Sequence, residues 1–355
     1  MKIITRNILF FLLIIFSSCS SIYRFSIDVQ EPAMITLPVS AQNVLILNNS
    51  LAQPLDNGIE RDLNGKSIPA DYPLALDSMV WPAISEIANV LGESNFFNTV
   101  AIYKEPLRKD GEWLSPVYLS KEQQYNFFES DNFDALFVVE RLLFYLKENV
   151  NINKLNESTP YIDIRADGVL NCSMYVYGKE KPLSTFVVFD SLFVKYITYN
   201  DSLFLFKEIP EGVLHNLSIM VGNQAAKCVV PTWQTVERVL FVSQGARMQE
   251  AAGYAANRRW KNAESIWITE FEKNTKPVNK AKIAFNIAVA NEMQDKLEPA
   301  LEWVLKAKDY FKNSNTDIEN QIELADKYLT ELGRRIQNNR MLDLQWGKDI
   351  TGYDK

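Results

Sequence analysis

Hydrophobic and polar positions fall into three patterns along the chain. Residues 8–16 form an unbroken apolar run directly behind the basic residues Lys2 and Arg6. From about residue 41 to 230, apolar or alternating runs are interspersed with stretches of helical spacing, and beyond Thr232 only helical spacing is evident. Because strands repeat every two residues and helices every 3.6, the sequence predicts an α/β region followed by an all-helical region.

The first part of the α/β region has the order strand, helix, strand, helix, strand. The predicted strands cover 42–50, 96–103 and 134–147, the predicted helices cover 76–92 and 119–130, and a loop rich in Pro, Asp, Asn and Gly covers 51–73. Gly92 is expected to end the first helix, and Ser120 with Gln123 has the spacing of an N-terminal capping box. The short links permit parallel strand pairing through crossover helices.

The second part predicts a hairpin and a helix. Two long alternating strands, 161–178 and 183–198, are separated by a turn at 179–182, and Pro210 is expected to open the helix that follows. We therefore expect one mixed sheet flanked by helices, an α/β sandwich domain spanning 41–230. This order resembles the small α/β domain of the TolB amino-terminal and curli-secretion families, a resemblance of topology alone.

Small residues recur at helical spacing in the last third of the chain. The gap from Tyr254 to Ala263 matches the tetratricopeptide pattern. A second unit over 280–311 repeats it, with Ala300 37 residues after the equivalent Ala263. A more polar stretch, 318–336, is expected to cap the array. The sequence thus predicts an all-α, tetratricopeptide-like repeat domain over 231–340, followed by a tail over 341–355.

A longer pattern leads into this domain. It contains Pro-x-Trp before a predicted helix, an Arg five residues after the Trp, and Trp-x-x-Ala at a repeat turn, at Pro231, Trp233, Arg238, Trp260 and Ala263. This pattern resembles a family of uncharacterised Bacteroidetes-type lipoproteins that carry a domain of unknown function. The resemblance implies the order of the domains and does not imply an activity.

The amino terminus has the features of a lipoprotein signal. The apolar run is too short to span a bilayer as a helix, which requires about 20 residues, and it is followed by Ser17, Ser18 and Cys19. We expect a signal peptide over 1–18, lipidation of Cys19 and a tether over 19–40. An ordinary secretory signal and a retained anchor are the alternatives. The expected location is the cell envelope, on the outer membrane facing the periplasm.

Charge and cysteine content narrow the chemistry. The formal charge is −7, and removal of residues 1–18 discards two basic residues and leaves −9. An acidic surface repels nucleic acid, so nucleic acid is not an expected partner. Cys172 lies on a predicted strand face and is expected to be a buried thiol, although pairing with Cys228 is possible in an oxidising compartment. The single histidine, His215, is expected on a solvated helix face, and no metal or cofactor site is predicted.

The remaining candidates for chemistry are carboxylates and aromatic residues. Glu60 with Asp62, or Glu129 with Asp131, could serve a two-carboxylate hydrolase but are equally consistent with solvated loop charges. The tryptophans of the helical region could line a ligand groove or pack in the core; they are Trp260, Trp267 and Trp303. We expect a non-enzymatic, membrane-anchored adaptor whose repeats bind an envelope protein. The alternatives are a glycan-binding lipoprotein of a polysaccharide-utilisation system and a hydrolase.

The first prediction concerns the anchor. The intact mass of the chain from the membrane fraction should correspond to an acylated polypeptide that begins at Cys19, because several acyl chains together hold a protein stably on a bilayer. Cys19→Ala should release the protein into the soluble fraction. Equal membrane association of the two forms would contradict lipidation at this residue.

Overall fold

The computed structural model describes residues 22–54, 57–63, 66–69, 74–108, 111–115, 117–130, 132–151, 161–197, 205–242, 245–314 and 319–348. The chain divides into two compact units, each with a hydrophobic core. Pro32–Thr232 and Leu344–Asp349 form one, which we call the α/β unit. The segment that ends at Glu31 and Trp233–Asp343 form the other, which we call the helical unit.

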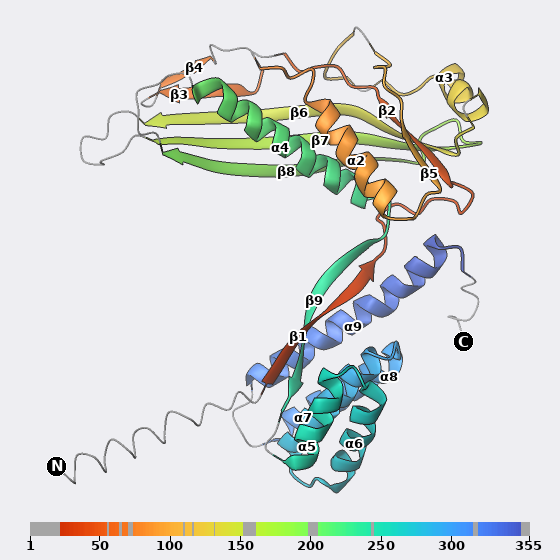
Figure 1. Ribbon diagram of the computed structural model, residues 1–355, viewed down its shortest axis with the longest axis vertical. Coiled ribbons are helices and arrows are strands. Elements are labelled where there is room, and N and C mark those ends of the chain that lie inside the picture. The colour runs from red at the N-terminus through yellow and green to blue at the C-terminus, as the bar shows by residue number, and fades with distance from the viewer. Residues whose placement is uncertain are drawn as a thin grey trace, which may run out of the picture. The chain divides into compact units, whose positions relative to one another are not determined.

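A mixed sheet forms the centre of the α/β unit (Figure 1). β2 (Asn43–Asn48) pairs in parallel with β5 (Thr99–Ile102) on one side and with β6 (Ala135–Asn151) on the other. β6 then pairs antiparallel with β7 (Tyr161–Val176), and β7 pairs antiparallel with β8 (Ser184–Ile197). The predicted mixed sheet, its parallel start and its hairpin are therefore confirmed.

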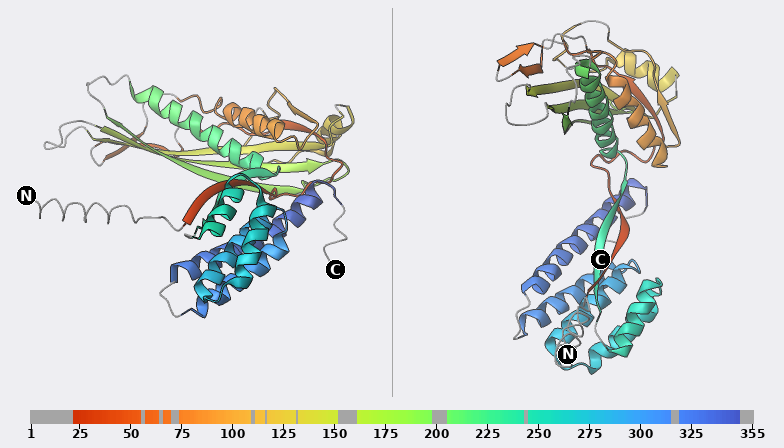
Figure 2. Two further views of the ribbon diagram at one scale, coloured as in Figure 1. Left: turned by 60° about the horizontal axis from the view of Figure 1, so that its bottom comes forward. Right: turned by 60° about the vertical axis from the view of Figure 1, so that its left-hand side comes forward.

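Two helices, α2 (Val80–Glu93) and α4 (Leu205–Lys227), cover one face of this sheet (Figure 2). They approach so closely that a Cβ added at Gly222 would lie 2.5 Å from the carbonyl oxygen of Ala83. Because real Cβ atoms never come that near to backbone, glycine is required at this crossing. The interface is apolar, since Ile84, Leu217 and Val221 are fully buried in the same core.

A short helical segment packs against the opposite face of the sheet. It consists of α3 (Lys121–Tyr125), whose start is held by the predicted capping box of Ser120 and Gln123, and the π-helical turn η2 (Asn126–Ser130). Phe127 and Phe128 join a smaller core there with residues of β2, β6 and β7. The capping box is confirmed, and this segment places a second layer over the parallel part of the sheet.

Three local predictions in the α/β unit were wrong. The expected loop 51–73 contains β3 (Ile59–Leu63), parallel to β6, and β4 (Lys66–Pro69), antiparallel to β3. Gly92 lies inside α2 on an exposed position, and Asn95, with φ of 55°, adopts the left-handed conformation after the helix. Pro210 lies within α4, which begins five residues earlier. Pro210 is buried, and packing offsets the backbone hydrogen bond that it cannot donate.

Five helices make up most of the helical unit. They are α5 (Ala246–Ala256), α6 (Trp260–Lys273), α7 (Pro277–Glu292), α8 (Leu297–Lys312) and α9 (Glu319–Gln345). The small residues that defined the repeat pattern, Ala251, Ala263, Ala288 and Ala300, are completely buried in one core. α9 is a single helix and includes residues 341–345, the first part of the predicted tail. A C-terminal region of several packed helices is confirmed.

The helical unit also contains a two-stranded sheet that the sequence did not predict. β1 (Ile22–Glu31) pairs with β9 (Thr232–Phe241), and we call this pair the ribbon (Figure 1). Val239, Leu240 and Phe241 enter the core of the helices. The expected tether over 19–40 and the expected absence of strands beyond Thr232 are therefore wrong. The two strands lie on either side of the α/β unit in the sequence, and each pairs only with the other. β1 alternates between polar and apolar residues from Arg24 to Gln30, whereas β9 shows no such alternation.

The second prediction tests the core of the helical unit. Ala300→Arg should lower the free energy of unfolding of this unit, because overpacking alone costs about 1–3 kcal/mol and a buried charge adds to that cost. Leu305→Arg on the same helix is the matched control, since Leu305 is 48% exposed. Thermal unfolding followed by circular dichroism should show a lower midpoint for the first variant only. An unchanged midpoint for Ala300→Arg would contradict the placement of this residue.

Candidate binding site

Arg238 forms a buried ion pair in the helical unit. It lies on β9 with 6% of its surface exposed, and it faces Glu292, the last residue of α7. Nε donates to Oε2 of Glu292 at 2.8 Å, and Nη2 donates to Oε1 at 2.8 Å. This two-point geometry matches the planar fork of a guanidinium to a carboxylate and fixes both side chains.

Two residues of α9 complete the shell around Glu292. The hydroxyl of Tyr328 donates to Oε2 at 2.6 Å, and Arg335 forms an ion pair with Oε1. Burial would raise the pKa of Glu292, but the hydrogen bonds and charges of Arg238, Tyr328 and Arg335 outweigh it, and the pKa lies below its usual value. Burial and the neighbouring Glu292 charge raise the pKa of Tyr328 well above its usual value. The carboxylate stays ionised and the phenol stays neutral.

The network continues from this buried carboxylate to β1. Arg238 Nη2 lies 3.6 Å from Oε1 of Glu331, which also pairs with Arg334 at 2.9 Å. Arg334 pairs in turn with Glu31 at the end of β1, and Asn338 donates to the same carboxylate at 2.6 Å. Alternating charges thus connect both strands of the ribbon to α7 and α9. We call this group the charge cluster.

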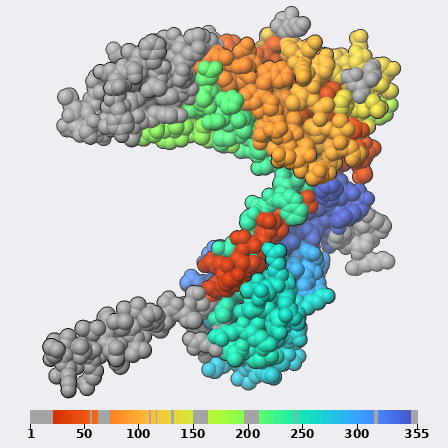
Figure 3. Space-filling model, in the orientation of Figure 1, coloured from red at the N-terminus to blue at the C-terminus, as the bar shows by residue number. Residues whose placement is uncertain are grey.

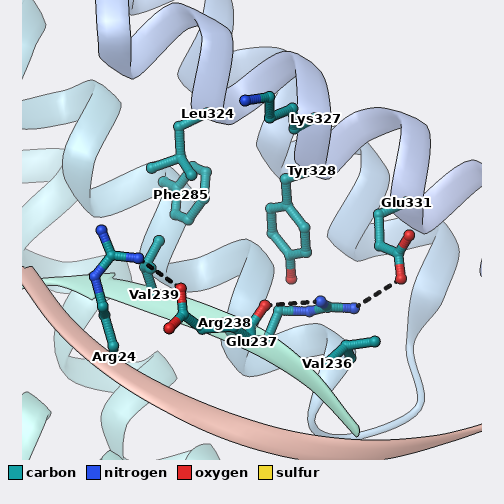
Figure 4. A pocket seen from close by; sticks show the side chains of 10 residues that line it. All are labelled: Arg24, Val236, Glu237, Arg238, Val239, Phe285, Leu324, Lys327, Tyr328 and Glu331. Carbon is teal, nitrogen blue, oxygen red and sulfur yellow. Dashed lines mark hydrogen bonds and ion pairs between the residues drawn. The ribbon is translucent and has the colours of Figure 1, made fainter. Parts of the chain in front are cut away.

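An open pocket of about 370 Å³ lies above the cluster, between β9 and α9 (Figure 4). Its walls are mostly aliphatic and aromatic, and the side chains of Arg238, Tyr328 and Glu331 point into it. We call it the Arg238 pocket. The lining residues are Arg24, Val236, Glu237, Arg238, Val239, Phe285, Leu324, Lys327, Tyr328 and Glu331.

Two surface ion pairs form the rim of this pocket. Arg24 on β1 pairs with Glu237 on β9 at 2.5 Å, and both side chains are more than half exposed. Lys327 on α9 pairs with Glu323 one turn earlier at 2.7 Å, and both of these are also well exposed. Exposed pairs contribute little net free energy. Their charges are therefore available to a ligand at small cost, in contrast with the buried pair below them.

The edge of β9 is closed at one position by a side-chain amide. Asn286 on α7 is fully buried; its amide nitrogen donates to the carbonyl of Phe241 at 2.8 Å, and its oxygen accepts from the Phe241 N–H at 2.8 Å. The amide therefore makes the two backbone hydrogen bonds that a neighbouring strand would make at Phe241. Together with the charge cluster, it fixes β9 against α7 and leaves the preceding residues of β9 beside the pocket.

The lining residues are apolar, aromatic or charged. Among the described residues that line the pocket there is no serine, threonine, cysteine or histidine, and the phenol of Tyr328 is held neutral by its raised pKa. In the parts of the chain that the structure describes, no group of three or more His, Cys, Asp or Glu side chains is placed to hold a metal ion. The pocket offers fixed charges at its base, apolar walls and exchangeable charges at its rim.

The cysteine and histidine candidates are dispersed. Cys19 lies outside the described residues. Cys172 is buried in the sheet and Cys228 is half-buried; both are free thiols, and burial raises the pKa of each. His215 is exposed on α4, as expected. The structure does not bring any of these residues to the Arg238 pocket.

The carboxylate pairs do not form a site in the described residues. Glu60 is exposed on β3, and Asp62 is partly exposed on the same strand. Glu129 is exposed and accepts a hydrogen bond from the Tyr177 hydroxyl at 2.7 Å, and Asp131 lies outside the described residues. Neither pair lines the Arg238 pocket.

The tryptophan candidates have different environments. Trp267 is completely buried and belongs to the core. Trp303 is partly buried and packs edge-on against Phe271, with ring centroids 5.1 Å apart. Trp260 is partly buried, contacts Phe25 of β1 and lines a second cavity. Only Trp260 therefore borders a space that a ligand could enter among the cavities described here.

The pattern that carried the family resemblance contains one residue of the site. Arg238 is the centre of the charge cluster, whereas Trp233 is 70% exposed and Ala263 is a core contact. Sequence reasoning missed Glu292, Tyr328 and Arg335. The one signal for Glu292 was an acidic residue at the end of the apolar helix "KIAFNIAVANE".

A second buried carboxyl group lies in the α/β unit. Glu140 is 3% exposed at the irregularity of β6, between Val139 and Arg141. Burial raises its pKa above the usual value, partly opposed by a hydrogen bond from Asn49. The Asn49 amide donates to Glu140 at 2.7 Å and also to the carbonyl of Val117 at 2.6 Å. Asn49, directly after β2, thereby links the carboxyl group on β6 to the backbone at Val117.

Comparison with protein families places the chain. Residues 41–241 match the family described as "Domain of unknown function (DUF8603)", which is more than half of the sequence, and the chain belongs to this family. Residues 249–334 match a second "Domain of unknown function (DUF6340)". Both the α/β unit and the helical unit therefore have uncharacterised relatives. A search of curated proteins finds no match.

Solved structures show only distant similarity. A Xanthomonas campestris protein of the DUF330 family has 9% identity and a TM-score of 0.23, and the match covers 55% of this chain and 85% of that one. A putative neuraminyllactose-binding hemagglutinin homolog from Helicobacter pylori has 10% identity and a TM-score of 0.27, with 55% and 87% covered. Since both TM-scores are below 0.5, neither likeness supports an argument about function. Within the described residues, no helix has the length and hydropathy of a membrane span.

The third prediction tests the charge cluster. Glu292→Gln keeps the size of the side chain but leaves Arg238 and Arg335 without their shared counter-charge, so the helical unit should lose roughly 3–5 kcal/mol of stability at pH 7. Glu298→Gln, on the exposed start of α8, is the control. Urea unfolding at 222 nm should show the loss in the first variant only.

The loss of stability in Glu292→Gln should depend on pH. Because the folded-state pKa of Glu292 is lowered, its contribution to stability is present above the pKa of the unfolded chain and is lost as pH falls through the folded pKa. The difference between wild type and Glu292→Gln should therefore shrink below about pH 4.3, the usual value for Glu. A difference that is constant from pH 7 to pH 3 would contradict the assignment.

Proposed function

We propose that this protein is a non-catalytic adaptor that binds another protein through the Arg238 pocket of its helical unit. The observation that carries the proposal is the pocket itself: about 370 Å³, open, with apolar walls over a fixed charge cluster. Pockets of this size bind small apolar groups and use a few polar atoms for orientation. One large side chain of a partner, or a small part of its backbone, matches that volume.

The walls and rim indicate the chemistry of that partner. Phe285, Leu324 and Val239 offer an apolar surface, and the exposed Lys327 and Arg24 offer positive charge that only surface pairs now satisfy. An apolar or aromatic anchor flanked by carboxylates would replace those weak pairs. Anchors of this kind dominate the binding energy of protein interfaces.

The helical unit is further proposed to be tetratricopeptide-like. Buried alanines where successive helices contact each other, and a more polar final helix, are features that support this interpretation. We also propose that the protein is a member of a Bacteroidetes-type lipoprotein group. This proposal is supported by the amino-terminal pattern and by the motif around Arg238. Stacked helical repeats serve mainly to bind proteins and peptides.

The anchor completes the proposal. Lipidation at Cys19 would attach the protein to the outer membrane, facing the periplasm, with β1 beginning a few residues later. Confinement to one membrane raises the effective concentration of the pocket towards other envelope proteins without any new contact. A non-catalytic adaptor gains from this arrangement because its affinity need not be high.

The fourth prediction tests the pocket in cells. A photo-crosslinking amino acid at Lys327 should give discrete adducts with an envelope protein, whereas the same group at Lys312, exposed at the end of α8, should not. Leu324→Asp should abolish the adducts, because a central anchor contact typically contributes 2 kcal/mol or more, roughly a thirtyfold change in affinity. Identical adducts at both positions, or adducts that survive Leu324→Asp, would contradict the proposal.

A further inference from the structure

A second cavity, of about 530 Å³, follows β1 on the helical unit. Five of the six residues from Tyr23 to Asp28 line it. Side chains of a strand alternate between its two faces, so consecutive residues can share one groove only where the groove runs along the strand edge. In Figure 3, β1 (red) lies at the molecular surface beside α5 (teal). We call this space the β1 groove.

The strand edge in this groove has no strand partner. Among the described strands, β1 pairs with β9 and with nothing else, so one of its two edges is unpaired. An unpaired edge presents N–H and C=O groups that can template another extended chain. Asn286 closes β9 at Phe241 with its side-chain amide, but the hydrogen bonds in the described structure include no such closure on β1 between Tyr23 and Asp28.

Small side chains on the opposite side of the groove leave space for a ligand beside β1. Ala255 and Ala256, at the end of α5, present only methyl groups, and Trp260 and Met293 form the wall. The aromatic rings already contact one another: Tyr23 and Phe25 are stacked with centroids 5.9 Å apart, and Phe25 and Trp260 are tilted by 31° with centroids 5.6 Å apart. Because these ring faces are partly used, the backbone edge is the larger unsatisfied feature. This favours an extended polypeptide over a sugar ring.

Arg258 supplies the positive charge of the groove. It lies in the turn between α5 and α6 with φ of 58°, a conformation that is uncommon for residues other than glycine. Its side chain is exposed and lines the groove, and it forms no hydrogen bond or ion pair with the described residues. Asp28, in contrast, already accepts a hydrogen bond from Thr235 at 2.6 Å. The Thr235 hydroxyl is neutral, so Asp28 keeps its charge, but Arg258 has no ion-pair partner among the described residues and can pair with a carboxylate of a ligand.

We propose that the β1 groove binds an extended acidic segment of a partner protein by strand addition to the free edge of β1. The backbone of the segment pairs with β1, small apolar side chains lie over Ala255 and Ala256, and a carboxylate pairs with Arg258. This surface is separate from the Arg238 pocket, which lies between β9 and α9. The two proposals can therefore fail independently.

The fifth prediction uses a synthetic probe. A fluorescein-labelled ten-residue peptide that alternates valine and glutamate should bind the full chain in detergent micelles with saturable anisotropy. A peptide with lysine in place of glutamate should bind about tenfold more weakly, as expected for a charge reversal at an interface. A valine–glutamate peptide with N-methylated alternate amides should not bind, because it cannot donate the backbone hydrogen bonds.

Substitutions in the groove test whether the peptide binds there. Arg258→Asp tolerates the left-handed backbone and should reverse the preference in favour of the lysine peptide. Ala256→Trp, at an exposed position, should fill the groove and weaken binding about tenfold or more, whereas Lys312→Glu on α8 should leave binding unchanged. Hydrogen exchange should slow at β1 amides when the acidic peptide is bound.

Several results would overturn this inference. They are no binding of the acidic peptide at millimolar concentration, equal binding of the N-methylated peptide, or loss of binding in Leu324→Asp and not in Ala256→Trp. Saturable binding of a neutral oligosaccharide that Ala256→Trp abolishes, with no peptide binding, would reassign the groove to glycans and would equally refute strand addition.

Discussion

The carboxylate of Glu292 is the point at which the helical unit is held together. It pairs with Arg238 on β9 and with Arg335 on α9, and it accepts a hydrogen bond from Tyr328 on α9. Glu292 itself is the last residue of α7. A charge this deeply buried is tolerated only when it is fully paired, and removal of one partner leaves the others uncompensated. The position of the ribbon depends on this group, and so do the Arg238 pocket and the β1 groove, which the ribbon lines.

The ribbon explains why the domain boundaries could not be read from the sequence. β1 precedes the α/β unit and β9 follows it, so the helical unit is assembled from both ends of the chain. A boundary search along the sequence assigns β1 to a tether and β9 to a helical domain. Only tertiary pairing identifies them as one sheet, because the two strands are about 200 residues apart in the sequence and β9 shows no regular alternation.

Much of the remaining fold could be predicted, and for clear reasons. Long elements with one dominant pattern, such as the β7–β8 hairpin, were found because burial on one face imposes a strict period. Contacts in which a side-chain amide replaces a backbone hydrogen-bond partner could not be predicted. Gln53 brackets the N–H and C=O of Phe144, and Gln345 does the same for Ala33. Such pairs join residues 91 and 312 positions apart and leave no local signal.

The candidate site was predictable only in part. Arg238 belongs to the pattern that carries the family resemblance, but its role depends on Glu292, which lies 54 residues later in the sequence and beside it in the fold. Glu292 and Tyr328 lie on separate helices, and their contact depends on the crossing of α7 and α9 against β9. The lining of the Arg238 pocket then follows from the cluster: buried, paired charges lie at the base, apolar residues form the walls and exposed ion pairs form the rim.

Native-state hydrogen exchange in Arg238→Met tests most directly whether the charge cluster holds the ribbon in place. The account predicts that amides of β1, β9 and α9 lose protection together, by roughly 100-fold or more, while β2 and β6 exchange as in the wild type. Arg247→Met, a change in an exposed ion pair on α5, should leave all of these rates unchanged. Undiminished protection of the β9 amides in Arg238→Met would show that the ribbon is held by its apolar contacts alone, and would contradict the account.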